Sequence, residues 1–535
     1  MLTKTSSRIL WCSLLLGICF DILFWKKSPG ISFFIFTALL IVAGLILGIW
    51  NKRKPAAFTW VLAGMALVFS AMTFIRQEPF TTFINVVLTF CSLALMALTY
   101  ASGIWPRYSL ADTVTGLARL TSSMLAGGST LLAESRKSEV LVTGDQPAPA
   151  KRSFSVWAII RGLLLAFPIV FFMALLLVSA DPVFSKELQK ILEIERFIQY
   201  AVRLVLVCII AYLLSGIYLY AVEKSGRKDL IGLEKPWFPA FLGFTESTIV
   251  LVGVNLLFAF FVAVQFKYFF GGQSNIMVNG YTYAEYARKG FGELVWVAIF
   301  SLILFLGLSA VTRRESAIKQ HWFSGLCLTL VGLVGVILVS SFMRLSLLEA
   351  AYGFSRLRTY SHVFMVWLGI LLAAVLVLEI VNYRRGVAIA AFFVLIGFGL
   401  TLNILNVDGF IVKANVDRTR AGEELDYQYF QELSTDSVPQ TIKEFRGMDD
   451  PEIKNMIGVS LTCRKAALED QLGDWHWQGY QMSFDTALTS LKALEPELAD
   501  FQIVKYTEGS WRTYSVKTPD GEKDCFKEYR DYEMD

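Results

Sequence analysis

Charged residues are scarce in this sequence. Asp, Glu, Lys and Arg together make up 18% of its 535 residues, whereas 55% are hydrophobic, and the mean hydropathy is +0.53. A soluble globular protein needs more polar surface than such a composition supplies. The shortage of charge therefore excludes a soluble protein and indicates a chain that lies mostly in a lipid bilayer.

Recognised motifs for catalysis and metal binding are also missing. The chain has no GxxxxGKS/T phosphate loop, no GxSxG elbow, no HExxH helix and no CxxC pair. Its three histidines, His321, His362 and His476, are far apart in sequence, and none lies at ligand spacing from a cysteine. We therefore predict no metal and no cofactor, and the sequence argues against an enzyme more than for one.

Long apolar runs, in contrast, are abundant. A helix needs about 20 mainly apolar residues to cross the ~30 Å hydrocarbon core of a bilayer. The sequence thus predicts an all-α polytopic transmembrane helix bundle of about 11 spans, with the lipid bilayer as its main partner. The candidate spans are Ile9–Trp25, Gly30–Trp50, Ala57–Ile75, Phe80–Ile104, Trp157–Ser179, Tyr200–Val222, Ser247–Phe266, Phe291–Val311, Trp322–Phe342, His362–Tyr383 and Val387–Leu405.

Charge is divided unevenly along the chain. Residues 411–535 hold 15 Lys and Arg against 25 Asp and Glu, and the remaining residues hold 34 against 20. The basic excess lies in short loops between apolar runs, where it reports membrane orientation rather than a nucleic-acid partner. Basic clusters follow every second span, which predicts a cytoplasmic N-terminus and an extracytoplasmic C-terminus. Four charges oppose this orientation: Lys26, Lys27, Arg356 and Arg358.

These patterns divide the chain into four parts. Residues 1–104 form an N-terminal four-span segment, and residues 105–153 form a cytoplasmic amphipathic segment and linker. Residues 154–405 form a seven-span membrane core, and residues 406–535 form a polar C-terminal domain. In the second part, apolar residues recur at near-helical spacing from Leu110 onward, which predicts a helix along the membrane surface.

The polar tail carries the signals of a small α+β extramembrane domain. Asp450 followed by Pro451 is typical of a helix N-terminus, and Gly473 can end that helix. Ser483 is expected to cap a second helix. Further on, two strand-like segments flank a Pro-Asp-Gly-Glu sequence at 519–522, which predicts a β-hairpin.

Two cysteines lie in this tail, whereas the other five lie in apolar runs. Cys463 is expected in the helix after Pro451, and Cys525 in the second strand of the hairpin. If the tail lies outside the cytoplasm, the two thiols meet a non-reducing space and can form a disulfide. The alternative is that both are simply buried thiols.

Two segments at predicted outer span ends mix acids, arginines and aromatics. One interpretation is an aromatic belt with arginines that bind lipid headgroups, and the other is a polar pocket beneath the tail. The residues of this candidate outer-face polar cluster are Tyr283, Glu285, Arg288, Glu293, Glu349, Tyr352, Arg356 and Arg358.

We predict that the two segments meet in space, because Tyr281–Gly290 precedes the eighth span and Glu349–Tyr360 joins the ninth and tenth spans on the same side of the membrane. Glu285 or Glu349 would then pair with Arg356 or Arg358, because charges that partly leave water need partners. If the second segment is helical, Tyr352 and Arg356 share one face.

Several motifs resemble those of one membrane family. They are Glu285–Phe291, Ala351–Arg358, Asn406–Asp408 with Ala414–Arg418, and Leu433–Pro439. Together they resemble a bacterial polytopic membrane family known only as a domain of unknown function, over roughly residues 166–494. The resemblance implies a multi-pass protein of the bacterial plasma (inner) membrane, but it brings no reaction, substrate or catalytic residue.

Three functions remain open on these grounds. The first is a membrane scaffold or sensor that displays an extracytoplasmic domain, which the long tail favours. The second is a transporter of a small amphipathic or lipid-like solute, although clear inverted repeats are lacking. The third is a membrane-embedded enzyme that acts at the outer face. A lipid or small-molecule ligand fits each of them, and the sequence identifies no protein partner.

Overall fold

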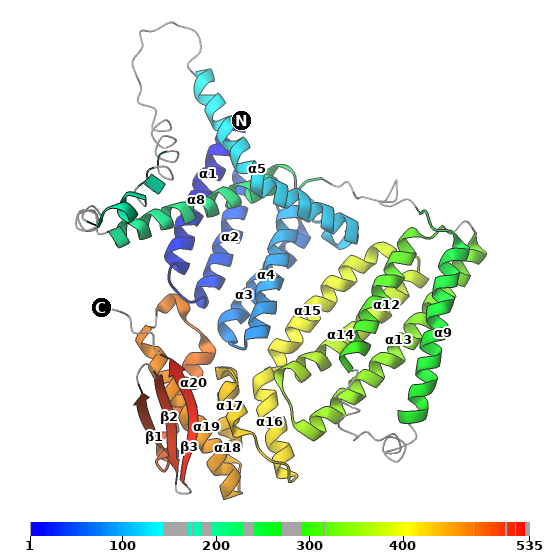
Figure 1. Ribbon diagram of the computed structural model, residues 1–535. Helices are drawn as coiled ribbons and strands as arrows, with labels where there is room; N and C mark the ends of the chain where they lie inside the picture. Colours follow the sequence, from blue (N-terminus) through cyan, green and yellow to red (C-terminus); the bar gives the residue numbers. More distant parts are fainter. Residues whose placement is uncertain are drawn as a thin grey trace. The chain divides into compact units, whose positions relative to one another are not determined.

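The computed structural model describes residues 2–142, 194–227, 230, 240–269, 291–313, 316–474, 476–508, 511–518 and 521–529, together with positions 166, 170, 172–173 and 176–182. Helices dominate, and a small antiparallel sheet lies near the C-terminus (Figure 1). The chain divides into two compact units. One comprises residues 1–26, 39–54 and 119–224, and the other residues 27–38, 55–118 and 225–535.

Ten helices in the described part of the chain are long and apolar enough to cross a membrane. The predicted polytopic helix bundle is therefore confirmed, and ten of the eleven predicted spans coincide with these helices. The remaining one, Trp157–Ser179, lies mostly outside the described residues. The ten are α1 (Leu2–Phe24), α2 (Ile31–Trp50), α3 (Ala57–Ile75), α4 (Pro79–Thr99), α8 (Ile194–Glu223), α9 (Phe244–Phe269), α12 (Phe291–Val311), α13 (Ala317–Tyr352), α14 (Arg356–Ile380) and α15 (Val387–Leu405).

The first unit is built on the packing of α1 against α8. A Cβ on Gly17 of α1 would lie 2.7 Å from the carbonyl oxygen of Val207 on α8, so the two backbones approach closely there. Asp21 and Arg203 form an ion pair between the same helices, with an N–O distance of 2.6 Å. This pairing neutralises two charges that lie within candidate spans.

A further helix, α5 (Leu110–Val142), covers the amphipathic segment that the sequence predicted to be helical. It begins after a short 3₁₀ turn, Trp105–Arg107. The predicted linker that follows it lies outside the described residues.

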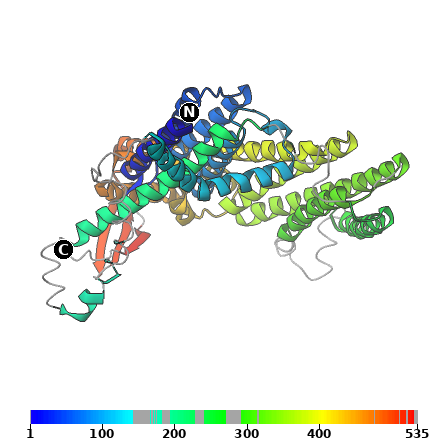
Figure 2. The ribbon, with the colours of Figure 1, turned by 90° about the horizontal axis from the view of Figure 1, so that it is seen from above.

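In the second unit, α13 packs against α9, α12 and α14, while α15 packs against α14 and α4 (Figures 1 and 2). Buried amides bridge these helices. The Asn255 side chain of α9 donates to the Leu326 carbonyl of α13 at 3.0 Å. Asn85 of α4 and Asn403 of α15 exchange two hydrogen bonds, of 3.1 and 2.7 Å. Each bridge satisfies polar groups that hydrocarbon would leave without partners.

The connection from α13 to α14 is shorter than the sequence analysis expected. The predicted spans stopped at Phe342 and resumed at His362, but α13 continues to Tyr352 and α14 begins at Arg356. Gly353 makes the turn with φ +80°, a conformation that side chains strongly disfavour. The condition under which Tyr352 and Arg356 would share one helical face, a single helix through this segment, is therefore not met, because the turn lies between them.

The C-terminal domain joins the bundle without a linker. α15 ends at Leu405 and α16 begins at Val407. The single residue between them, Asn406, adopts a left-handed conformation. Four further helices and three strands complete the domain. The elements are α16 (Val407–Arg420), α17 (Tyr427–Glu432), α18 (Val438–Arg446), α19 (Pro451–Asp470), α20 (Met482–Ala493), β1 (Gln502–Glu508), β2 (Trp511–Thr518) and β3 (Gly521–Tyr529).

Of the structural features that the tail sequence predicted, the Asp450 cap and the β-hairpin are confirmed, whereas the Ser483 cap is wrong. Asp450 caps α19 by accepting hydrogen bonds from two backbone amides of its first turn, as predicted. Ser483 does not cap α20, because that helix begins one residue earlier and Gln481 holds the cap position. The Ser483 hydroxyl instead bonds the Thr435 hydroxyl at 2.7 Å. The predicted hairpin is present as β2 and β3, and β1 extends it to an antiparallel sheet in the order β1-β2-β3.

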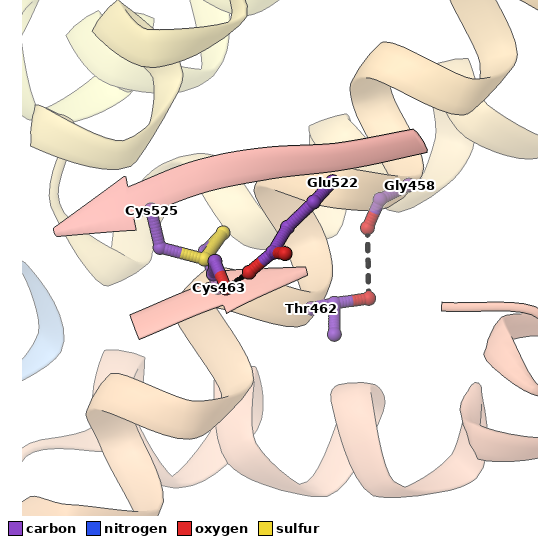
Figure 3. Close-up of a disulfide and its surroundings, with 6 residues drawn as sticks. Gly458, Thr462, Cys463, Glu522 and Cys525 are labelled. Carbon is purple, nitrogen blue, oxygen red and sulfur yellow. Dashed lines mark hydrogen bonds between the residues drawn. A yellow bond between two sulfur atoms is a disulfide. The ribbon is translucent and has the colours of Figure 1, made fainter. Parts of the chain in front are cut away.

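A disulfide connects this sheet to the helix behind it. Cys463 on α19 and Cys525 on β3 are bonded, with their Cα atoms 5.5 Å apart (Figure 3). That separation is within the range that a disulfide requires. Of the two alternatives that the sequence left open, the thiols are therefore bonded rather than simply buried, and the bridge connects the sheet to α19.

One apolar core runs from the bundle into the domain. Leu88 of α4 and Leu402 of α15 belong to the same buried cluster as Ile411 of α16, Leu461 of α19 and Leu491 of α20. The C-terminal domain is therefore packed onto the membrane helices rather than suspended from them.

Candidate functional site at the junction of bundle and C-terminal domain

An ion pair between Arg356 and Asp408 lies at the centre of the junction. Arg356, the first residue of α14, donates from Nε and Nη2 to the two carboxylate oxygens of Asp408, at 2.8 and 2.7 Å. Asp408 lies in the first turn of α16 and is fully buried. A negative charge is favoured at a helix N-terminus, and the two-point geometry fixes both side chains.

Backbone groups complete this pair. The amide of Ser434 donates to Asp408 Oδ2 at 2.6 Å, and the Arg356 amide donates to the Tyr429 hydroxyl oxygen at 3.0 Å. Burial raises the pKa of Tyr429, which keeps its hydroxyl protonated. The pair thus connects α14, α16 and the segment around α17.

The loop between α3 and α4 forms the second half of the junction. Glu78 caps α4 by accepting from the amides of Phe80 and Thr81, at 3.0 and 2.7 Å. The Tyr360 hydroxyl of α14 donates to the same carboxylate. Across the interface, Asp436 Oδ2 accepts from the amides of Gln77 and Glu78, at 2.8 and 2.9 Å. Carboxylates from both sides therefore satisfy backbone donors that a junction would otherwise bury without partners.

Arg464 of α19 adds a positive charge to this region. Burial lowers its pKa to about 10, while the neighbouring Asp408 charge raises it and the Arg356 charge lowers it further. Its buried Nη2 has no hydrogen-bond partner among the described residues. The three carboxylates of the network, Glu78, Asp408 and Asp436, are all hydrogen-bonded within it. Such an arrangement holds the bundle and the C-terminal domain together.

The predicted cluster is only partly assembled here. Arg356 pairs with Asp408 rather than with Glu349, and Glu349 pairs with His362 at 3.2 Å. Among the described residues, Glu349 therefore forms no ion pair with either arginine, while the alternative pairing through Glu285 lies outside them. Arg358 instead donates to the carbonyl oxygens of Tyr352 and Gly353.

The other predicted residues give less information. Tyr352 ends α13 and is 56% exposed, and Glu293 is exposed in the first turn of α12. Tyr283, Glu285 and Arg288 lie outside the described residues, so the expected meeting of the two segments stays a prediction.

Sequence reasoning missed most of the junction. It did not identify Glu78, Tyr360, Asp408, Asp436 or Arg464 as partners. A signal existed for two of them, because Asp408 and Asp436 lie in the Asn-Val-Asp and Leu-Ser-Thr-Asp motifs that carried the family resemblance. In the described part of the chain, no group of three or more His, Cys, Asp or Glu side chains converges as metal ligands would.

Fold and junction together define a multi-pass α-helical membrane protein whose small mixed domain is locked onto its bundle. The chain belongs to the family described as domain of unknown function DUF4153, whose model matches residues 63–444. No curated protein and no solved structure matches the chain. The matched region includes Glu78, Arg356, Asp408 and Asp436 but ends within α18, before Arg464 and the disulfide.

Proposed function

We propose that this protein is a scaffold of the bacterial plasma membrane that displays its C-terminal domain in a fixed position outside the cytoplasm. The single observation that carries the proposal is the buried Arg356–Asp408 pair. A domain that only needed tethering would need no such pair, because a flexible linker serves that purpose. A domain that must face a partner in one orientation needs a rigid joint.

Two further contacts support a rigid joint. Asn406, the only residue between α15 and α16, donates to the Asp436 carbonyl at 2.9 Å. At the start of α2, the Ile31 amide donates to the Tyr480 carbonyl at 3.0 Å. A Cβ on the neighbouring Gly30 would lie 2.5 Å from the same oxygen, so the chain there fits closely against the domain.

The disulfide supports the extracytoplasmic side. Stable disulfides persist in oxidising compartments and are rare in the cytoplasm of most cells. The alternation of basic clusters along the spans leads to the same orientation. Digestion of intact protoplasts should remove the domain and leave the bundle. Survival there with cleavage in inverted vesicles would reverse the orientation and remove this part of the proposal.

Hydrogen exchange of the purified protein tests the rigid joint. Asp408→Ala removes a fully buried carboxylate and leaves Arg356, whose side chain is 25% exposed, without its charge partner. Breaking a fully buried pair costs about 3–5 kcal/mol, and the partial exposure of Arg356 lowers that cost. We expect faster exchange in residues 407–412 and 433–437, with the strands unchanged. Arg446→Ala is the matched control, because it removes an exposed Arg–Glu pair from the same domain and should change little.

Asp408→Asn provides a second variant that keeps the size of the side chain and one acceptor. It should give an intermediate effect. Protection of the junction that is equal in Asp408→Ala, Asp408→Asn and wild-type protein would refute the joint.

A cleft in the domain favours sensing as a second candidate function. It has a volume of about 430 Å³, within the range of small-molecule sites. Its lining combines Tyr427, Met456 and Val459 with the opposite charges of Glu452 and Lys523. A thermal-shift screen of zwitterionic metabolites tests this role. A stabilising compound should lose its effect in Lys523→Ala but not in Lys492→Ala.

A further inference from the structure

Three side chains at one end of α13 and α14 are arranged in the order acid, histidine, serine. Glu349 Oε2 lies 3.2 Å from His362 Nδ1. The other ring nitrogen, Nε2, lies 3.4 Å from the hydroxyl oxygen of Ser346. Ser346 and Glu349 belong to α13 and His362 belongs to α14, so no linear motif reveals the group.

Burial suits the three residues to different roles. Glu349 is 3% exposed, whereas Ser346 lies on the surface of the bundle and 17% of the His362 side chain is exposed. A buried carboxylate on Nδ1 holds the proton on that nitrogen. Nε2 then carries no proton and faces two oxygens at 3.4 Å, the Ser346 hydroxyl, which can donate to it, and the Phe342 carbonyl. An unprotonated ring nitrogen beside a serine hydroxyl is the arrangement that activates a serine nucleophile.

In this structure the Ser346 hydroxyl does not donate to His362. The hydroxyl donates to the Phe342 carbonyl at 3.1 Å, and the distance to His362 Nε2 is slightly longer than a poised nucleophile and base require. Hydrogen bonds of this kind commonly shorten only when substrate binds. Ser346 Oγ already lies near both acceptors, so turning its hydroxyl hydrogen exchanges the carbonyl oxygen for the imidazole nitrogen.

The depth of the group in the membrane indicates the substrate. α13 has 36 residues. At a rise of ~1.5 Å per residue it is roughly 54 Å long, well beyond the ~30 Å hydrocarbon core. Ser346 lies six residues before the end of α13 and His362 six residues after the start of α14, about 9 Å in each case. If the excess length of α13 is shared equally by its two ends, roughly 12 Å of each end lies outside the hydrocarbon core. Ser346 then falls in the interface, where the ester groups of membrane lipids lie.

The surroundings fit a lipid as well. Large apolar side chains are exposed beside the group, including Phe342 at 38%, Met343 at 44% and Leu357 at 70%. Arg358 lies one helical turn before His362 on α14, and arginine suits the phosphate of a lipid headgroup. The group is therefore open to acyl chains and has a cation close to the headgroup level.

We propose that Ser346, His362 and Glu349 form a serine-hydrolase site for carboxylic esters of membrane phospholipids. Ser346 Oγ attacks the ester carbonyl carbon while its proton passes to His362 Nε2. Collapse of the tetrahedral intermediate breaks the ester bond, and His362 returns the proton to the departing alcohol. Water then adds to the acyl-serine through the same base and releases a fatty acid. Glu349 is a positioning residue that orients His362.

An active-site probe tests the proposal directly. The full-length protein in detergent is treated with a fluorophosphonate, which reacts with activated serines, and the modified residue is identified by peptide mass spectrometry. Modification of Ser346 is expected. Ser361 is the internal control, because it is a partly exposed serine on α14 whose hydroxyl donates to the Leu357 carbonyl of its own helix, and it should stay unmodified. Because this readout uses wild-type protein, it does not depend on how a variant folds.

Hydrolysis of a fluorogenic diacyl phospholipid in mixed micelles gives the second readout. Ser346→Ala should reduce the rate to background, and His362→Gln should lower it by about 10²–10⁴, the usual contribution of a general base. Glu349→Gln should lower the rate and shift its pH profile, which loss of packing alone would not do. Ser361→Ala should keep the wild-type rate.

The proposal is overturned if the wild-type protein is neither modified at Ser346 nor faster than Ser346→Ala. Equal modification of Ser346 and Ser361 would also overturn it, because it shows no activation. The scaffold proposal is tested separately, by hydrogen exchange at the Asp408 junction. Either proposal can therefore fail without the other.

Discussion

Removal of the Cys463–Cys525 disulfide gives a prediction whose size follows from the structure. The two cysteines are 62 residues apart in sequence. In the chain-entropy model, closing a loop of that length lowers the entropy of the unfolded chain by about 14 cal/mol/K, which corresponds to about 4 kcal/mol at 25 °C. The Cys463→Ser, Cys525→Ser double variant should lower the free energy of unfolding of the domain by roughly that amount.

The serine side chains add a second effect to this value. Cys463 is buried beside Val459 and Val516, where a serine hydroxyl without a partner costs about a further 1–3 kcal/mol. Reduction of the wild-type protein removes the crosslink without this effect and therefore isolates the contribution of the crosslink.

The assay is thermal and urea unfolding of the purified protein, followed by tryptophan fluorescence, with and without reductant. Reductant should destabilise the wild-type protein and leave the double variant unchanged. Cys208→Ser is the control, because Cys208 is an exposed free cysteine in the first unit. A wild-type unfolding curve that does not respond to reductant, although alkylation shows both thiols to be free, would refute the reasoning.

Three further predictions follow from the described contacts. Asn85→Ala and Asn403→Ala should show a coupling of about 0.6 kcal/mol in a double-mutant cycle of thermal stability, and additive effects would contradict the reciprocal amide pair. Gly353→Ala should destabilise the protein by about 1–3 kcal/mol, because φ is +80° and the new Cβ would lie 2.8 Å from Arg418 Nη1. Gly253→Ala, which meets no atom within 4 Å, should be tolerated in the same melting assay. Hydrogen bonds from Ser515 and Tyr506 lower the pKa of Glu522, so its stabilisation is complete above the ordinary carboxyl pKa and is lost as pH falls through the lower value. Between pH 7 and pH 3, the unfolding midpoint should therefore depend less on pH in Glu522→Gln than in the wild-type protein, whereas Glu424→Gln should keep the wild-type dependence.

The positions of the spans could be predicted because they depend on run length alone. A run of about 20 apolar residues spans hydrocarbon as a helix wherever its neighbours lie, since the helix is the structure that satisfies all backbone groups within a single segment. The same is true of the Asp450 cap and the β2–β3 hairpin, which depend on residues close together in sequence.

The ends of α13 and α14 were predicted less well. Polar residues near Glu349 and Arg358 lowered the hydropathy, so the expected spans stopped early. In the folded protein those polar groups are paired or bonded to carbonyl oxygens, which allows the helices to continue. A hydropathy value treats every charged side chain as exposed to water. It therefore cannot include the effect of a partner on another helix.

Long-range pairing was decided only by the tertiary structure. Tyr360 and Glu78 are 282 residues apart, and Asp436 and Gln77 are 359 apart. Arg356 had several acidic candidates in sequence, and its choice of Asp408 depends on where α16 turns after Asn406. The Ser346, His362 and Glu349 group likewise exists only because Gly353 brings α14 back along α13. Composition and run length thus determined that the chain is a membrane bundle with a folded tail. Which charges meet was determined by the packing of helices, because electrostatic partners are selected by distance in space.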